Sequence, residues 1–189
     1  SDYNRIFNND IIVDLLKILG CGVEIKSKHN KDLNNFDIEK LNWGKVIICT
    51  DADVDGYQIR TLVLTMFYVL TPTLLEEGYV YIAESPLYEI IDSKGKSYFA
   101  YDEKEKSIIE KKLKKGYKIQ RSKGLGENEP EMMWETTMNP KTRRLIQVTM
   151  CDVEEANKYF ELFLGGNVNN RRSFIEENGH KYIDITDLV

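Results

Sequence analysis

Three aspartates at alternate positions are the residues of this sequence best suited to chemistry. Asp51, Asp53 and Asp55 follow directly on the apolar run KVIICT at residues 45–50. In an extended backbone, residues i, i+2 and i+4 point to one face, so we expect the three carboxylates to converge. Like charges in one site repel each other unless a cation neutralises them. Oxygen ligands without His or Cys favour Mg²⁺, a cation that assists phosphoryl transfer.

Two other interpretations of the same aspartates need no magnesium. Acidic residues at the start of a helix can simply cap it. The segment DADVDG also fits the first six positions of a calcium-binding loop, but the twelfth position requires Glu and is Leu62 here. A strand rather than a helix precedes the segment, so the calcium loop is excluded. A nucleotide-sugar transferase, which also places acidic pairs after a strand, remains an alternative.

The elements around the aspartates are expected to form a strand–helix–strand unit. The unbroken apolar run at 45–50 is typical of a strand buried on both faces. A helix follows, in which Pro72 is an interruption and Gly78 a stop, and residues 79–84 form the next strand. This order predicts a βαβ unit with the acidic turn at the carboxyl end of its first strand. One face of the helix is expected to be apolar: Ile59, Leu62, Val63, Met66, Phe67 and Leu70.

Other segments show helical or strand patterns. An amphipathic helix is expected at 6–19, and a hairpin around a Ser-Lys-Gly turn is expected beyond Pro86. The basic run at 111–115 is interpreted as a solvated helix face. Further elements are a helix at 102–115, a strand at 117–123, a glycine-containing loop at 123–130, a helix through Met132 to Trp134, a strand at 143–150, and helices at 152–164 and 170–181.

Composition limits the possible partners. The 189 residues are 42% hydrophobic and 30% charged, which is typical of a globular protein. The net charge of −5 argues against nucleic-acid binding by bulk positive charge, so any DNA contact needs local Lys/Arg clusters or metal ions. Cys21, Cys49 and Cys151 are expected to be thiols without disulfides. No apolar run is long enough to cross a bilayer, and the N-terminus lacks the apolar region of a signal peptide, an absence that favours the cytoplasm.

The segment TDADVDGYQIRTL at residues 50–62 resembles the second acidic motif of the Toprim domain of type IIA DNA topoisomerases. It is most similar to the B subunit of bacterial DNA gyrase or of topoisomerase IV. Four further segments agree in the expected order: EEGYVYIAESPLY at 76–88, SKGLGENEP at 122–130, MWETTMNPKTRRL at 133–145 and RRSFIEEN at 171–178.

The resemblance implies an α/β fold, with a mostly parallel, Toprim-like sheet flanked by helices and truncated at its N-terminal strand. We expect a partial Toprim domain at 1–100. We expect a C-terminal α+β extension at 101–189, which carries the KGLGE loop and helices leading to the partner subunit.

The resemblance also implies roles for single residues. Asp51 and Asp53 would bind the catalytic Mg²⁺ ions, with Asp55 supporting them directly or through water. Lys123 becomes a candidate DNA-phosphate contact, although an ordinary exposed lysine is its alternative. Arg60 would either face DNA or pair with the aspartates. The neighbouring Gly124 and Gly126 are expected to let the backbone turn tightly.

The reaction that the resemblance implies is double-strand cleavage and religation of DNA by a tyrosine on the partner A subunit. ATP would be hydrolysed only by the full-length protein. Two departures qualify this expectation: no Glu-Gly-Asp-Ser motif supplies the remaining metal-binding glutamate, and Tyr57-Gln58 replace the usual small residue and His. We therefore expect the chain to be inert by itself. The alternative is a scaffold that binds DNA or a partner without metal chemistry.

Overall fold

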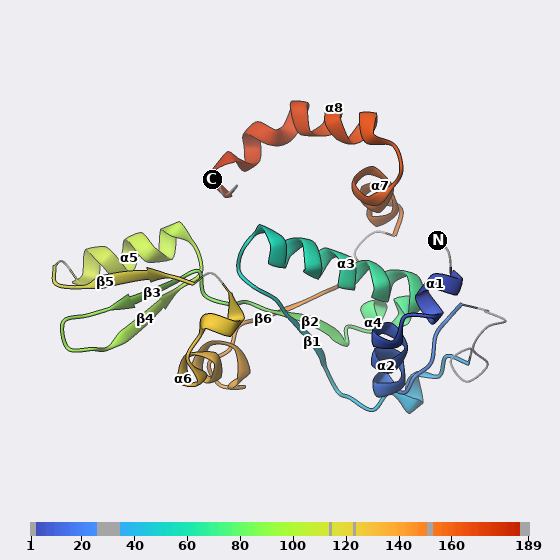
Figure 1. Ribbon diagram of the computed structural model, residues 1–189, viewed down its shortest axis with the longest axis horizontal. Coiled ribbons are helices and arrows are strands. Elements are labelled where there is room, and N and C mark those ends of the chain that lie inside the picture. The colour runs from blue at the N-terminus through green and yellow to red at the C-terminus, as the bar shows by residue number, and fades with distance from the viewer. Residues whose placement is uncertain (1–2, 26–34, 114, 123, 151–152, 186–189) are drawn as a thin grey trace. The chain divides into compact units, whose positions relative to one another are not determined.

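A computed structural model describes residues 3–25, 35–113, 115–122, 124–150 and 153–185 (Figure 1). The chain divides into two compact units. The first comprises Ser1–Ile48, Arg60–Ala83 and Leu145–Thr149, and the second comprises Cys49–Ile59, Glu84–Arg144 and Met150–Val189. Both units combine helices with a small three-stranded sheet, which confirms the expected α/β class. The proposed division at residue 100 stays a prediction.

The first unit begins with two helices where the sequence predicted one. α1 spans Tyr3–Phe7 and α2 spans Asp10–Leu19. Asn9 separates them because its side-chain oxygen accepts hydrogen bonds from the backbone N–H groups of Ile11 and Ile12, at 3.1 and 3.2 Å. A side-chain acceptor in this position starts a new helix. The single helix predicted at 6–19 was therefore wrong at its N-terminal turn.

α3 spans Val54–Leu70 and α4 spans Pro72–Glu76, so the predicted interruption at Pro72 is confirmed. Glu24 connects the chain after α2 to the corner between them. Its N–H donates to the carbonyl of Leu70, and its Oε1 accepts from the N–H of Thr73, both at 2.8 Å. The core of this unit consists of residues that are almost fully buried: Leu16, Val23, Phe67, Leu70, Leu74 and Val80.

The apolar face predicted for α3 is buried only in the C-terminal half of the helix. Phe67 and Leu70 are each 1% exposed, whereas Ile59 is 53% and Leu62 is 51% exposed. The expectation was wrong for these two residues because helical spacing fixes which side chains share a face, but not how far along the helix the core extends.

Strands β1 (Val46–Cys49), β2 (Val80–Ala83) and β6 (Leu145–Gln147) form the sheet of the first unit in the order β1-β2-β6. β1 and β2 are neighbours, as a βαβ unit requires, and the N–H of Val46 donates to the carbonyl of Tyr79 at 2.8 Å. β6 pairs with β2 antiparallel. The expected parallel sheet therefore carries an antiparallel strand.

The second unit contains the predicted hairpin and amphipathic helix. β3 (Tyr88–Ile91) lies between β4 (Ser97–Ala100) and β5 (Lys118–Arg121), and both pairings are antiparallel. α5 (Glu103–Leu113) covers this sheet through Ile109 and Leu113, which pack against the buried cluster of Tyr88, Ile90 and Ala100.

The remaining elements of the second unit are mostly helical. A 3₁₀ turn at Leu125–Glu127 precedes α6 (Pro130–Met133), which continues into a π-helical turn at Trp134–Met138. α7 (Val153–Leu164) and α8 (Val168–Asn178) follow, and a 3₁₀ segment spans Gly179–Ile185.

Cys21 and Cys49 form no disulfide within the described residues, as expected, whereas Cys151 lies outside them. None of the helices in the described parts of the chain is both long and apolar enough to span a bilayer.

Candidate functional site

The acidic turn connects β1 to α3. Asp51 and Asp53 lie in this turn and are half-buried, whereas Asp55 belongs to the first turn of α3 and is exposed. The extended backbone predicted through all three aspartates was therefore wrong at Asp55, because the helix already begins at Val54. No group of three or more His, Cys, Asp or Glu side chains placed to hold a metal ion occurs among the described residues.

The carboxylate of Asp51 is held by the KGLGE loop. The backbone N–H of Leu125 donates to Oδ1 of Asp51 at 2.7 Å. A Cβ atom on Gly124 would lie 3.6 Å from Oδ2 of the same carboxylate, which is ordinary contact distance. A hydrogen bond to a carboxylate is stronger than one between neutral groups, so this contact fixes the orientation of Asp51.

Asp53 caps α3, as one of the alternative interpretations of the sequence required. Its Oδ1 accepts from the N–H of Gly56 at 2.8 Å, and its carbonyl accepts from the N–H of Tyr57 at 3.0 Å. A carboxylate at this position also complements the positive end of the helix dipole. The capping contact occupies one carboxylate oxygen, so capping alone does not exclude a second role for the other oxygen.

Gly56 is a residue of the site that the sequence interpretation missed. A Cβ atom at this position would lie 2.1 Å from the carbonyl oxygen of Asp51. Real Cβ atoms do not approach a backbone oxygen so closely, so a larger residue requires the turn to move. The sequence signal was the glycine three positions after Asp53, where the capped helix makes its first turn.

The loop that contacts Asp51 is itself held in place by hydrogen bonds of Ser122 and Asn128. The N–H of Ser122 donates to the carbonyl of Leu87, and the hydroxyl of Ser122 donates to Oδ1 of Asn128, both at 2.9 Å. The N–H of Asn128 donates to the carbonyl of Leu125 at 3.3 Å, and its side-chain amide contacts the sulfur of Met133 at 3.7 Å. Asn128 therefore closes the loop, and Ser122 fixes the loop to the end of a strand.

Of the two glycines expected in a tight turn, Gly126 lies in one, the 3₁₀ turn Leu125–Glu127, whereas Gly124 does not. Gly124 is extended, at φ −154°, and neither Gly124 nor Gly126 is among the described glycines with positive φ. The tight turn is the 3₁₀ turn that begins at Leu125. A Cβ atom on Gly124 would make only an ordinary contact with Asp51, so the close approach of the backbone does not require glycine there. Lys123, the candidate phosphate contact, lies outside the described residues.

A second contact holds the end of β1. The hydroxyl of Ser85 donates to the carbonyl of Thr50 at 3.3 Å, and both residues are buried. Ser85 was not singled out by the sequence interpretation, although it lies in the segment EEGYVYIAESPLY at 76–88. The backbone immediately before Asp51 is thus fixed by a side chain that follows the next strand of the chain.

Two arginines have different environments. Arg60, on α3, is partly buried and belongs to the first compact unit, whereas the aspartates belong to the second. Its proposed contact with DNA or with the aspartates stays a prediction. Arg144 forms an ion pair with Glu105 at 2.6 Å and lies 3.8 Å above the ring of Tyr101. The hydrogen bond from Arg144 to Glu105 raises the pKa of the Arg144 guanidinium, and this arginine connects two segments within the second unit.

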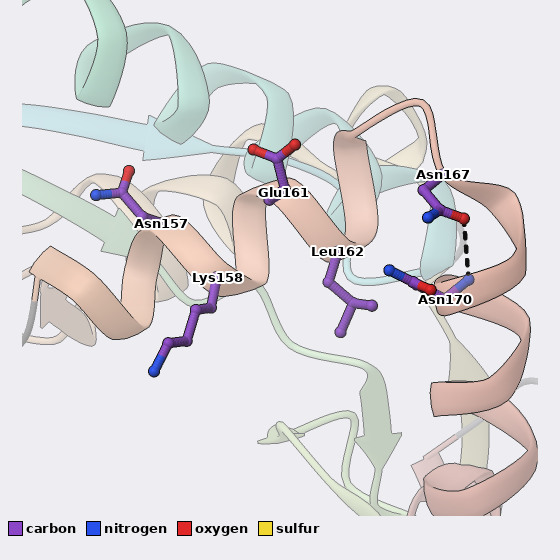
Figure 2. A pocket seen from close by; sticks show the side chains of 6 residues that line it. All are labelled: Asn157, Lys158, Glu161, Leu162, Asn167 and Asn170. Carbon is purple, nitrogen blue, oxygen red and sulfur yellow. Dashed lines mark hydrogen bonds between the residues drawn. The ribbon is translucent and has the colours of Figure 1, made fainter.

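An open pocket of about 600 Å³ on α7 and α8 contains none of the predicted site residues (Figure 2). Glu161 and Leu162 project from different sides of α7 in this view, and Oδ1 of Asn167 accepts from the N–H of Asn170 at 3.3 Å. Five of the six lining residues are polar, but Glu161 is the single carboxylate among them, so the lining offers no carboxylate pair for a cation. The lining residues are Asn157, Lys158, Glu161, Leu162, Asn167 and Asn170.

The donor chemistry of the acidic turn fits a magnesium ion. One oxygen of Asp51 and one of Asp53 accept hydrogen bonds, and within the described residues the second oxygen of each is left for a cation. Magnesium commonly uses one or two protein carboxylates and completes its octahedron with water and phosphate oxygens. The two half-buried aspartates thus offer the number of protein carboxylates that magnesium commonly uses.

Two family models match the chain. Residues 6–85 match the Toprim domain, and residues 114–176 match the DNA gyrase B subunit, carboxyl terminus. The first match contains the acidic turn, and the second contains the loop that donates to Asp51.

The B subunits of DNA gyrase from several organisms are similar to nearly the whole chain. That of Thermotoga maritima is 43% identical over 182 residues, which are 96% of this chain and 27% of the relative. That of Archaeoglobus fulgidus is 47% identical over 172 residues, which are 90% of this chain and 25% of the relative. That of Staphylococcus aureus is 44% identical over 177 residues, which are 93% of this chain and 26% of the relative. The chain thus spans about a quarter of the length of these relatives. Its matched regions are those of the Toprim domain and of the carboxyl terminus of the B subunit. The chain therefore belongs to the DNA gyrase B family.

Proposed function

We propose that this chain supplies the magnesium-binding aspartates of a type II DNA topoisomerase. Asp51 and Asp53 would hold Mg²⁺, and Asp55 would support them from the first turn of α3. The observation that carries the proposal is the fixed carboxylate of Asp51, which presents one oxygen to Leu125 and leaves the other for a cation. The proposed reaction is the cleavage and religation of both strands of a DNA duplex, and membership in the DNA gyrase B family supports it.

Bound magnesium would stabilise the charge that develops on the attacking and leaving oxygens of a phosphodiester. The residues of the chain prepare the site for this. The N–H of Leu125 orients Asp51, Gly56 lets the first turn of α3 pack against the backbone of Asp51, and the N-cap contact orients Asp53. Orientation by such neighbouring groups raises the affinity of ligand side chains for a metal.

The proposed partners follow from the family. The A subunit would supply the tyrosine that forms the phosphodiester with DNA, and ATP hydrolysis would belong to the full-length protein. A protein acting on chromosomal DNA in bacteria would work in the cytoplasm, at the nucleoid. Lys123 and Arg60 remain the proposed DNA contacts from the sequence. By itself the chain would be inert, because two carboxylates hold magnesium only weakly without the DNA phosphates and the additional glutamate.

A scaffold without metal chemistry is the second candidate. The observation in its favour is that Asp53 already has a structural role as the cap of α3. In this alternative, the aspartates stabilise the turn and the chain contributes only surfaces for DNA or for the partner subunit.

Replacement of Asp51 in the assembled enzyme separates the two candidates. Asp51→Asn keeps an oxygen that accepts from Leu125 but removes the negative charge, so the turn stays intact while the magnesium ligand is weakened. We expect DNA cleavage to be lost, as in Asp51→Ala, while ATP hydrolysis continues. Retained cleavage by both variants would exclude the metal assignment. Calorimetric titration of the chain alone with Mg²⁺ should show weak binding, and a dissociation constant below about 1 μM would contradict its proposed inertness.

A further inference from the structure

Two turns of the second unit meet at one end of the sheet β4-β3-β5. The turn at 92–96 joins β3 to β4, and the segment at 114–117 joins α5 to β5. Ile91, the last residue of β3, is paired with Ser97 on one side and with Lys118 on the other, so both connections leave the same end of the sheet. A Cβ atom on Gly116 would lie 3.7 Å from Cβ of Ser93, which places the two turns side by side (Figure 1).

This end of the sheet is strongly basic. Six described lysines lie in the two turns, in the last turn of α5 and at the start of β5, and all six are exposed. Within the described residues, none of them forms an ion pair with a carboxylate. We name this surface the basic end; its members are Lys94, Lys96, Lys111, Lys112, Lys115 and Lys118.

The carboxylates nearby have local partners within the fold. Oδ1 of Asp92 accepts from the N–H groups of Lys94 and Lys96, at 2.8 and 3.0 Å, and these backbone bonds hold the pKa of Asp92 below its usual value. Oε1 of Glu110 accepts from the hydroxyl of Tyr117 at 3.2 Å. A third carboxylate at this end of the sheet is Glu89, whose Oε1 accepts from the hydroxyl of Ser97 at 2.5 Å. The six ammonium groups therefore outnumber these three carboxylates, in a chain whose net charge is −5. The sequence interpretation treated residues 111–115 as a solvated helix face, but it could not place Lys94 and Lys96 beside them.

We propose that the basic end binds the sugar–phosphate backbone of duplex DNA, independently of sequence. Lysine side chains are flexible and end in a compact positive charge. Such groups bind phosphates of the DNA backbone but do not distinguish one base pair from another. The lysine cluster by itself indicates a polyanion as the ligand, and the choice of DNA rests on the proposed function. It assigns a DNA contact that belongs neither to the acidic turn nor to the KGLGE loop, and it accounts for DNA binding by a chain of negative net charge.

The test uses the full chain, a fluorescently labelled DNA duplex and a series of salt concentrations in EDTA, with binding followed by anisotropy. We expect a dissociation constant of about 10⁻⁴–10⁻⁶ M, in the range of non-specific binding. Lys94→Gln/Lys115→Gln/Lys118→Gln should weaken binding at low salt by about tenfold or more and reduce the slope of the salt dependence by about one unit for each phosphate that the variant no longer neutralises. Arginine at the same three positions should restore binding.

The matched control is Lys17→Gln/Lys40→Gln/Lys158→Gln, which removes the same charge from other surfaces. An equal loss of affinity in this control would overturn the proposal, because bulk charge would then explain the binding. Absence of salt-dependent binding by the unmodified chain, or tighter binding to vesicles of anionic lipid than to the duplex, would overturn it as well. Duplex binding is measured in EDTA, whereas the metal assignment is tested by Mg²⁺ titration and DNA cleavage, so failure of the basic end and failure of the metal site give different results.

Discussion

The backbone N–H of Leu125 donates a hydrogen bond of 2.7 Å to Oδ1 of Asp51, across 74 residues of sequence. This contact joins the two most specific segments of the chain, the acidic turn and the KGLGE loop. The donor is a backbone N–H, and proline is the one substitution that removes it. The contact therefore provides a direct way to test whether the loop orients the proposed metal ligand.

Leu125→Pro removes this donor at a position where proline is tolerated. Leu125 is the first residue of a 3₁₀ turn, and Gly124 before it is extended, as a residue before proline prefers to be. In the assembled enzyme we expect the Mg²⁺ concentration for half-maximal DNA cleavage to rise about 10- to 100-fold, because Asp51 loses its orientation. Leu125→Ala keeps the N–H and is the control. An equal effect in both variants would show that the side chain, rather than the hydrogen bond, is responsible.

Substitutions of Asp53 should separate its cap from its proposed metal ligation. Asp53→Ala loses the contact with the N–H of Gly56 and should lower the free energy of unfolding by about 1 kcal/mol. Asp53→Asn keeps an oxygen acceptor and should be nearly as stable as the unmodified chain, measured by urea denaturation. Both variants should impair cleavage in the assembled enzyme. If Asp53→Asn cleaves DNA normally, Asp53 is only a cap.

Gly56→Ala should disturb the acidic turn. The added methyl group would lie 2.1 Å from the carbonyl oxygen of Asp51, so the turn or the first turn of α3 must move. We expect the free energy of unfolding to fall by about 2–3 kcal/mol, as in other overpacked sites. Gly126→Ala, where no atom lies within 4 Å of the added Cβ, is the matched control. Thermal melting that leaves Gly56→Ala as stable as this control would contradict the close contact.

A hydrogen bond from the hydroxyl of Tyr88 to Glu103 should make stability depend on pH. The bond holds the pKa of Glu103 below its usual value, and burial, with this bond, raises the pKa of Tyr88. The stabilisation is present above the unfolded pKa of a glutamate, about 4.3, and is lost as the pH falls through the lower folded pKa. On the alkaline side it is present below the unfolded pKa of a tyrosine, about 10, and is lost as the pH rises through the higher folded pKa.

Tyr88→Phe should therefore lower the free energy of unfolding by about 0.5–1 kcal/mol at neutral pH, since Glu103 is largely exposed. The difference from the unmodified chain should shrink in acid. Glu103→Gln, which accepts a hydrogen bond but does not titrate, should lack this acid dependence. Urea denaturation over a range of pH measures each effect, and a difference that stays constant below about pH 4.3 would contradict the assignment.

Most of the local structure could be predicted from the sequence, because it depends on neighbouring residues. The strand before Asp51, the interruption at Pro72 and the amphipathic α5 follow from apolar spacing, proline chemistry and the order of charges. The predictions of local structure were wrong where a hydrogen bond between neighbouring residues started a helix at a position that the side-chain pattern did not indicate. Asn9 divided the first helix by accepting two backbone hydrogen bonds, and the capped start of α3 took Asp55 out of the extended turn.

By itself the sequence determined which groups are available, namely the aspartates after an apolar strand, the glycine-containing loop and the lysine-rich segments. Their partners were decided only by the tertiary structure. The contact between Leu125 and Asp51 requires two segments far apart in sequence to meet, and the basic end requires the strand pairing that brings the turn of Ser93 beside Gly116. The physical reason is that a side-chain pattern repeats over a few residues and fixes local conformation. Contacts between distant segments depend on the packing of the folded chain.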